Sequence, residues 1–399
     1  MKVSVHDVPS GRGWTLLTPH LISRCAANIL IHRCAANILI HRCAANILIH
    51  RCAANILIHR CAANILIHRM WTIVFGVVAF VVFALAVMAA VFGHIYRLRA
   101  GYTACVVSLK GKTIIVTGAS AGVGKEAAKD FAHRGARVIL ACRNSTKATS
   151  VAEDIQSCTG NKDVVVRQLD TSSLLSVRNF AKRILAEEER LDVLVLNAGI
   201  GGVGKRCLTE DGLELTMATN HFGHFLLANL LLGLLKKSTP SRVVVTSSMA
   251  HSHLKTLDLK NLNYEKGNYS LLQAYSQSKA CNILFTRYLA EMMKETGIVV
   301  NALCPGLVAT EIFQKSGGIL FGKIYRILSP ILGKTALQGA QTIIHLAISE
   351  ETAKITGEFF EDCKISDNIS PLVCDAGLAK KVWEASEACV NLQPEEHSY

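Results

Sequence analysis

A tyrosine and a lysine four residues apart, Tyr275 and Lys279, are the side chains of this sequence best suited to acid–base chemistry. On a helix, residues at this spacing share one face. A free phenol has a pKa of about 10 and is therefore a poor proton donor or acceptor at neutral pH. A nearby ammonium stabilises the phenolate and lowers that pKa. The spacing predicts that Lys279 tunes Tyr275 for proton transfer.

Three other segments carry polar side chains that could complete a site with this pair. The run RVVVTSSMAH ends at Ser247 and Ser248, the latter twenty-seven residues before Tyr275. A hydroxyl is therefore expected at the C-terminal end of a strand. The segment TNHFGH adds Asn220. The segment LNAG, after another strand, adds Asn197, Ala198 and Gly199.

A glycine-rich turn, TGASAGVG, joins the first strand of this part of the chain to a helix that is expected to open at Lys125. Glycines permit a tight turn and let backbone N–H groups approach a pyrophosphate, whose charge the helix N-terminus stabilises. The turn's place between a first strand and a first helix is typical of a dinucleotide site. The residues predicted to hold the dinucleotide here are Gly118, Ser120, Gly122, Val123 and Gly124.

The end of the second strand, ACRN, indicates which dinucleotide is preferred. In this fold an acidic residue about 20 positions beyond the glycines binds the ribose 2′-hydroxyl of NAD. No acid stands here, and Arg143 offers a cation for a 2′-phosphate instead. NADP(H) is therefore predicted to be preferred over NAD(H), with a solvated surface arginine as the alternative interpretation.

Short β-branched runs alternate with longer amphipathic stretches, such as those at residues 125–134 and 174–188, after Val106. The expected strands are Thr113–Thr117, Arg137–Ala141, Val164–Gln168, Val193–Leu196, Val243–Ser247 and Val299–Leu303. This alternation predicts an α/β fold with a doubly wound parallel sheet, and a ligand outside the C-terminal strand ends. No linker rich in Pro or Gly divides residues 104–399, so one Rossmann-type domain is expected.

These motifs, in this order over about residues 110–310, resemble the short-chain dehydrogenase/reductase family. Within it, VILACRN, TNHFGHFLL, YSQSKACNILFTRYLA, CPGLVATEI and TGEFFEDCK are similar to the membrane-anchored retinol dehydrogenase branch. The resemblance implies an NADP(H)-dependent oxidoreductase that interconverts a lipophilic alcohol, retinol-like, and its aldehyde or ketone. A steroid or other lipid carbonyl reductase, and a membrane-tethered NADP(H)-binding scaffold without turnover, are the alternatives.

The resemblance also implies roles for individual residues. Tyr275 would donate or accept the proton, and Lys279 would tune it and contact the ribose. Ser248 would donate a hydrogen bond to the carbonyl, and Asn220 would hold a relay water. The implied cofactor contacts are Asp170 for the adenine, Asn197, Ala198 and Gly199 for the supporting turn, and Pro305 and Gly306 for the nicotinamide-side loop. One departure is Leu196, where many relatives have asparagine.

An uncharged run, Trp71–Gly93, is long enough to cross a bilayer of about 30 Å. Residues 70–96 are therefore predicted to be a transmembrane anchor. Basic residues at 97, 99, 110 and 112 favour a cytosolic catalytic domain by the positive-inside rule. The endoplasmic reticulum is the expected membrane, with a mitochondrial membrane as the alternative. The expected partners are the bilayer and a lipophilic small molecule, and a homodimer is left open.

An apolar segment at residues 306–335 could cover a lipophilic substrate or simply pack against the core. It contains Ile312, Phe313, Ile319, Leu320, Phe321, Tyr325, Ile327, Leu328, Ile331 and Leu332. Four histidines, at positions 221, 224, 251 and 253, stand near the motifs without the spacing of a metal site. No metal is predicted.

The nonapeptide RCAANILIH occurs five times between Arg24 and His68. Nine residues advance a helix by about 900°, so successive copies lie on opposite sides and form no continuous apolar face. Residues 1–69 are therefore expected to be an unstructured leader, or absent from a native product that starts at Met70.

This leader also explains the charge of the chain. It holds eight of the 43 basic and one of the 30 acidic residues, so the remainder has a net charge of only +6 instead of +13. Nucleic acid is therefore not an expected partner. Half of all residues are apolar and 18% are charged, which excludes a mainly disordered chain.

Overall fold

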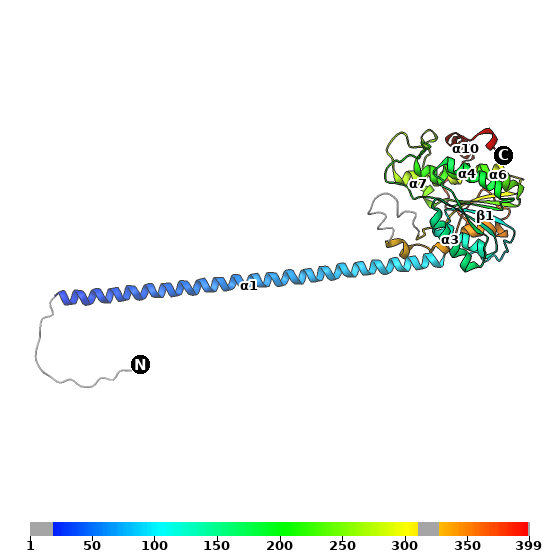
Figure 1. The fold of residues 1–399 in the computed structure, drawn as a ribbon. Helices are drawn as coiled ribbons and strands as arrows, with labels where there is room; N and C mark the ends of the chain where they lie inside the picture. The colour runs from blue at the N-terminus through cyan, green and yellow to red at the C-terminus, as the bar shows by residue number, and fades with distance from the viewer. Residues whose placement is uncertain (1–18, 310–326, 398–399) are drawn as a thin grey trace, which may run out of the picture. The chain divides into compact units, whose positions relative to one another are not determined.

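The computed structural model describes residues 19–309 and 327–397, and within them one sheet has eight strands (Figure 1). In chain order these are β1 (Thr113–Thr117), β2 (Arg137–Cys142), β3 (Val164–Gln168), β4 (Val193–Leu196), β5 (Ser241–Thr246), β6 (Ile298–Cys304), β7 (Phe359–Glu361) and β8 (Lys364–Ile365). Their spatial order is β3-β2-β1-β4-β5-β6-β7-β8. Every neighbouring pair is parallel except β7 and β8. The strand order reverses beside β1, which is where doubly wound sheets bind ligands.

Helices cover both faces of this sheet, and Figure 1 shows α3 on one side of β1 with α4, α6, α7 and α10 on the other. The first layer consists of α2 (Gly122–His133), α3 (Ser145–Thr159) and α9 (Ala336–Ile348). The second consists of α4 (Leu174–Glu187), α6 (Gly223–Lys237), α7 (Leu271–Met292) and α10 (Ala376–Val390). The single Rossmann-type domain predicted from the alternating pattern is confirmed.

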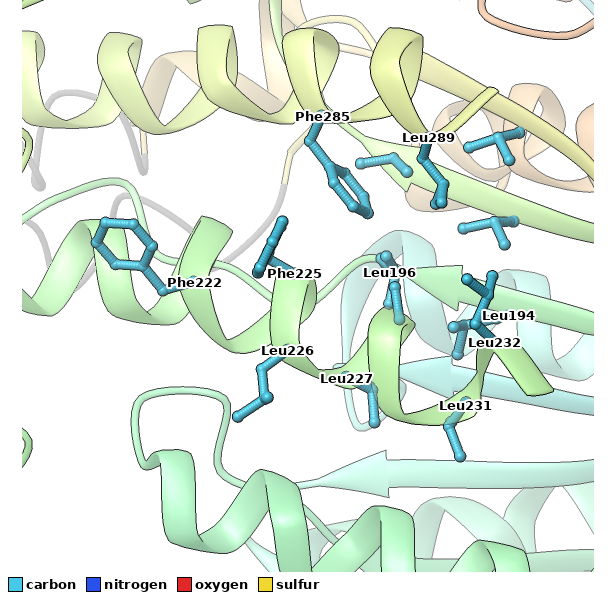
Figure 2. Packing of buried hydrophobic residues seen from close by; sticks show 14 of the residues in the cluster. Leu194, Leu196, Phe222, Phe225, Leu226, Leu227, Leu231, Leu232, Phe285 and Leu289 are labelled. Carbon is cyan, nitrogen blue, oxygen red and sulfur yellow. The ribbon is translucent and has the colours of Figure 1, made fainter. Parts of the chain in front are cut away.

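Alternate residues of each strand enter opposite cores, because successive side chains on a strand point to opposite faces. In β1, Ile114 and Val116 belong to the core under α2 and α9, whereas Ile115 belongs to the core under α6 and α7. In that second core Phe225 and Phe285 meet edge to face, with ring centroids 5.8 Å apart (Figure 2). Burial on both faces fixes the sheet, so its strand ends form a rigid edge.

The six expected strands are all present, and β1, β3 and β4 have the expected bounds. Strands β7 and β8 were not expected, because three and two residues are too short to show a periodicity. Helix α2 begins at Gly122, three residues before the expected start at Lys125. The last two glycines of the turn therefore lie in the first helical turn.

The N-terminal repeat is helical where the structure describes it, since α1 runs from Pro19 to Leu98 over 80 residues. The expectation of an unstructured leader is therefore wrong for residues 19–69. The repeat contains no Gly or Pro, and the two alanines, one leucine and one arginine of each copy favour helix. Its Ile and Leu side chains are exposed, as expected for a repeat without a continuous apolar face. A native start at Met70 stays a prediction, and peptide analysis of the native N-terminus tests it.

The chain divides into two compact units, Met1–Leu85 and Ala86–Tyr399, so the last turns of α1 belong to the same unit as the Rossmann-type domain. Among the described residues, one stretch, Ala26–Leu98 within α1, is long and apolar enough to cross a membrane. This helix suggests membrane anchoring.

Candidate active site

A cavity of about 840 Å³ lies at the C-terminal ends of the parallel strands, within the size range of ligand sites. Residues that directly follow β1 to β6 line it. It brings together most residues predicted from the sequence, namely Gly118, Ser120, Gly122, Val123, Arg143, Asp170, Asn197, Ala198, Gly199, Ser248, Tyr275, Lys279, Pro305 and Gly306. Gly124 and Asn220 are not part of its lining.

Helix α7 presents Tyr275 and Lys279 to this cavity, and both are almost fully buried, at 5% and 2% exposure. The Lys279 Nζ atom lies 5.7 Å from the centroid of the Tyr275 ring. It also donates a hydrogen bond of 3.0 Å to the carbonyl oxygen of Thr246. Burial lowers the pKa of Lys279 to about 8, because the ammonium loses its hydration. The pair therefore has the arrangement that the spacing predicted.

The two serines that follow β5, Ser247 and Ser248, make different hydrogen bonds. The Ser247 hydroxyl is buried and donates to the carbonyl oxygen of Lys279 at 2.7 Å. Ser248 is the N-cap residue of the 3₁₀ helix η2 (Met249–His253), and its hydroxyl oxygen accepts the N–H of Ala250 at 3.2 Å. An accepting hydroxyl keeps its own proton for another partner. Ser248 is therefore the serine that can donate to a ligand in the cavity.

His251 fixes the backbone of Ser248. Its Nδ1–H donates to the Ser248 carbonyl oxygen at 2.7 Å, and its Nε2 accepts the N–H of Ser370 at 3.2 Å. Because the two bonds use both ring nitrogens, they require the neutral Nδ1–H tautomer. Burial lowers the pKa of His251 and so favours that neutral form. No role in the site was predicted for His251 from the sequence.

Asn220 lies behind the cavity wall in a short π-helical turn, η1 (Ala218–Phe222). Its side-chain oxygen accepts the N–H of Ile200 at 2.8 Å. Its amide nitrogen donates to the Ile200 carbonyl and to the Ser278 hydroxyl, both at 3.0 Å. This side chain thus braces the loop after Gly199, and the relay-water role expected from the resemblance stays a prediction.

The glycine turn packs so closely on the LNAG turn that larger residues are excluded. Gly118 has φ +69°, and a Cβ there would lie 2.8 Å from the Cα of Ala198. A Cβ on Gly124 would lie 2.5 Å from the Asn197 amide nitrogen, which explains why Gly124 serves packing instead of lining the cavity. A bare glycine backbone at a helix N-terminus fits a dinucleotide pyrophosphate.

Thr117, the last residue of β1, ties these two turns together and was not singled out from the sequence. Its hydroxyl oxygen accepts the N–H groups of Asn197 and Ala198 at 2.8 and 2.9 Å. It also lies 3.0 Å from Nε2 of His224, whose Nδ1–H donates to the Asn220 carbonyl oxygen. Burial lowers the pKa of His224 to about 3, so the ring is neutral and acts as a hydrogen-bonding bridge.

The far end of the cavity, beyond β2 and β3, holds two cations. The Arg143 side chain is 65% exposed, with its Nε 3.9 Å from the Asp170 carboxylate. Lys147, which was not predicted from the sequence, also lines this end. It stands in the first turn of α3, where the Asn144 side chain caps its backbone N–H at 2.9 Å. Two cations at a helix N-terminus form an anion-favouring region.

Asp170 shares this end of the cavity. One oxygen of its carboxylate accepts both the N–H and the hydroxyl of Ser172, at 3.0 and 2.6 Å. These bonds hold the carboxylate at the end of β3.

The apolar segment at residues 306–335 is only partly described. Ile312, Phe313, Ile319, Leu320, Phe321 and Tyr325 lie outside the described residues. Residues 327–332 are helical, and Ile327, Leu328 and Ile331 are exposed.

A family model described as short chain dehydrogenase matches residues 112–259 and 261–318. The chain therefore belongs to the short-chain dehydrogenase/reductase family and is an oxidoreductase of that family. This confirms the resemblance that the motifs indicated.

Curated relatives narrow the comparison to the retinol dehydrogenases. The chain is 44% identical over 280 residues to retinol dehydrogenase 12 of Bos taurus, covering 70% of this chain and 86% of that protein. It is 43% identical over 289 residues to retinol dehydrogenase 11 of Homo sapiens, covering 72% and 89%. It is 40% identical over 301 residues to retinol dehydrogenase 14 of Homo sapiens, covering 71% and 88%.

Solved structures share the fold. An uncharacterised protein from Mycobacterium Paratuberculosis matches with a TM-score of 0.58 and 32% identity, covering 73% of this chain and 98% of that one. A short chain dehydrogenase from Burkholderia cenocepacia J2315 in complex with NADP matches with a TM-score of 0.50 and 26% identity, covering 63% and 96%.

Proposed function

We propose that this protein interconverts a lipophilic, retinol-like alcohol and its aldehyde or ketone, using NADP(H). One observation carries the proposal: the buried Tyr275–Lys279 pair lines the same cavity as Ser248 and the glycine turn. Fold alone does not establish function, but this set of groups supplies a proton donor, its tuning charge and a second hydrogen-bond donor.

The nicotinamide, when bound, would supply or accept the hydride. In reduction, the hydroxyls of Ser248 and Tyr275 hydrogen-bond the substrate carbonyl oxygen, and Tyr275 gives it a proton. The resulting phenolate is stabilised by the Lys279 ammonium 5.7 Å from the ring centroid. In oxidation, the Tyr275 phenolate takes the proton of the alcohol.

The preference for NADP(H) is supported by the charges at the far end of the cavity. Arg143 and Lys147 both line it, and no acidic residue follows β2 directly. Asp170, one strand further along, already accepts two hydrogen bonds from Ser172. The cations would attract a 2′-phosphate, which NAD(H) lacks.

The substrate class is supported by the relatives and by the wall of the cavity. The relatives named above are retinol dehydrogenases. Apolar side chains, of Ile200, Val203, Leu215, Met249 and Leu307, line the cavity beside the polar groups. An apolar wall would accept a steroid or another lipid carbonyl as well, so the choice between them is made by experiment.

We further propose that α1 anchors the protein in the endoplasmic reticulum, with the catalytic domain in the cytosol. Basic residues at positions 97 and 99 follow the apolar stretch, as the positive-inside rule requires. Asn144, Asn268 and Asn368 stand in glycosylation sequons, so the absence of endoglycosidase-sensitive glycans at all three is the expected result. A glycan at any of these positions would contradict this topology.

Membranes containing the full chain, incubated with NADPH and a panel of retinal-like, steroid and fatty carbonyls, test the activity. We expect oxidation of NADPH with a retinal-like aldehyde, and a much slower reaction with NADH. Turnover of steroids alone would favour the steroid alternative. NADPH binding without turnover of any member of the panel would favour the scaffold and contradict the proposal.

A further inference from the structure

A tyrosine of the anchor helix reaches the active-site cavity. Tyr96 stands in the last turn of α1, and it lines the same cavity as Tyr275. Its hydroxyl oxygen accepts the backbone N–H of Leu307 at 3.0 Å. Leu307 directly follows Pro305 and Gly306, the loop that the resemblance places beside the nicotinamide. The anchor helix and this loop, more than two hundred residues apart in sequence, are thus joined by one hydrogen bond.

Gly306 shows how tightly the loop and Tyr96 fit. The glycine has φ +83°, a conformation that other residues rarely adopt. A Cβ there would lie 2.6 Å from the Tyr96 hydroxyl oxygen and 2.9 Å from Nζ of Lys334. The loop therefore lies directly against both side chains, with no room for a larger residue.

Lys334 also makes hydrogen bonds to the loop that contains Gly306 and Leu307. Its backbone N–H donates to the Leu307 carbonyl oxygen at 2.8 Å, and its own carbonyl accepts the N–H of Ala309 at 3.1 Å. Its buried ammonium pairs with Asp362 and lies 5.0 Å from the centroid of the Tyr96 ring. A cation over a tyrosine ring is attracted by the ring's negative face. Tyr96 and Lys334 thus stabilise each other as well as the loop.

The end of α1 is itself fixed to the catalytic domain, so Tyr96 is held in place. One guanidinium nitrogen of Arg97 donates to the carbonyl oxygens of Pro330, Ile331 and Gly333, at 3.2, 3.2 and 3.1 Å. The side-chain amide of Gln338 donates to the Arg97 carbonyl oxygen at 3.1 Å. The Arg97 bonds cap carbonyls at the C-terminal end of the helical stretch at residues 327–332, and the Gln338 bond joins α9 to the anchor helix.

We infer that Tyr96 is a positioning residue of the active site, supplied by the membrane anchor. It holds the backbone of Leu307 and thereby sets the loop against which the nicotinamide half of the cofactor would lie. The anchor then does more than tether the enzyme, because its last turn forms a wall of the cavity. The inference rests on the proposed function for its catalytic consequence, but not for the contact itself.

Tyr96→Phe in the full chain tests the inference, since it removes the accepting oxygen and keeps the ring. Tyr102→Phe is the matched control, because Tyr102 is 76% exposed and does not line the cavity. Hydrogen exchange of the peptide containing Leu307 is measured first, in the cofactor-free protein. NADPH affinity and the kcat and KM of turnover are measured next, with the melting temperature as the measure of overall stability.

We expect Tyr96→Phe to exchange faster at Leu307 and to bind NADPH about 2- to 10-fold more weakly, the range for one lost hydrogen bond. The melting temperature of Tyr96→Phe should match that of wild type. Tyr102→Phe should match wild type in exchange, NADPH affinity and melting temperature. Unchanged exchange would overturn the inference. So would faster exchange with unchanged NADPH affinity and kinetics, or a uniform rise in exchange with a lower melting temperature. If wild type turns over no substrate, the proposed function fails, while exchange and NADPH affinity still decide the role of Tyr96.

Discussion

At one end of the cavity a tyrosine and a lysine are buried, whereas at the other end two cations are exposed and act through charge. The Tyr275 end consists of Tyr275, Lys279 and Ser248, and the first two are nearly inaccessible to water. The Arg143 end consists of Arg143, Lys147 and Asp170, and its ion pair is long and solvated. Buried groups act at full strength because water does not screen them, whereas exposed charges are screened by salt. Substitutions should therefore have large effects at the Tyr275 end and small, salt-dependent effects at the Arg143 end.

Lys279→Met should have the largest effect among the supporting residues of the Tyr275 end. Loss of the ammonium beside the phenol is expected to reduce kcat by about 10²- to 10⁴-fold, the range for a positioned acid or base. The same change should stabilise the fold, because a pKa depressed from 10.5 to about 8 means that burying the charge costs about 3 kcal/mol. The Thr246 carbonyl keeps the Asn282 amide as a hydrogen-bond donor. Kinetics and urea denaturation measure both effects, and an active or destabilised variant would contradict the account.

The pH dependence of turnover tests the role of Lys279 at the Tyr275 end. Lys279 is charged below about pH 8, so kcat for carbonyl reduction should fall about tenfold per pH unit above that value. The free energy of unfolding should rise between about pH 8 and 10.5, because Lys279 is still protonated in the unfolded chain when it has lost its proton in the folded one. His221 and His224, with pKa values lowered to about 4 and 3, should not titrate between pH 5 and 8. A reduction rate that stays constant up to pH 9.5 would exclude Lys279 as the tuning charge.

His251→Phe should have an intermediate effect, because His251 acts on Ser248 only through the backbone. We expect kcat to fall about tenfold, the equivalent of about 1.4 kcal/mol or one lost hydrogen bond, with NADPH affinity unchanged. His251→Gln, which can both donate and accept, should restore part of the loss. The exposed neighbour His253 provides the control His253→Phe. Equal losses in both phenylalanine variants would show that the effect is not specific to the Ser248 turn.

Arg143→Ala should have the smallest effect, confined to one cofactor. NADPH affinity is expected to fall about threefold at low salt and less at high salt, while NADH affinity is unchanged, because the exposed guanidinium is screened. Fluorescence titrations at two ionic strengths measure this difference. Equal weakening for both cofactors would remove the 2′-phosphate role and leave Arg143 as a solvated surface residue.

Local sequence patterns predicted much of the fold, the Tyr275–Lys279 pair and the glycine turn. The bounds of β1, β3 and β4, the shared face of Tyr275 and Lys279, and the glycine turn all depend on residues close in sequence. The N-terminal repeat was not predicted to be helical because it forms no continuous apolar face, although its alanines have a high helix propensity.

Contacts between distant segments could not be predicted in this way. The hydrogen bond between Tyr96 and Leu307 spans 211 positions, and no periodicity marks either residue. The same holds for the bond between His251 and Ser370. The hydrogen bonds that join Asn220, in its π-helical turn, to the backbone of Ile200 are a third example. Such bonds depend on how packed elements meet, which a single sequence does not display.

Tyr275→Phe, compared with Tyr288→Phe on the same helix, tests the central claim most directly. Tyr288 packs against Trp383 in the core and does not line the cavity, so it is a control for loss of a hydroxyl from α7. Single-turnover oxidation of NADPH with a retinal-like aldehyde should be lost in Tyr275→Phe by at least about 10³-fold, while NADPH affinity stays within about twofold of wild type. Tyr288→Phe should react like wild type. Retained turnover in Tyr275→Phe would contradict the assignment of Tyr275 as the proton donor.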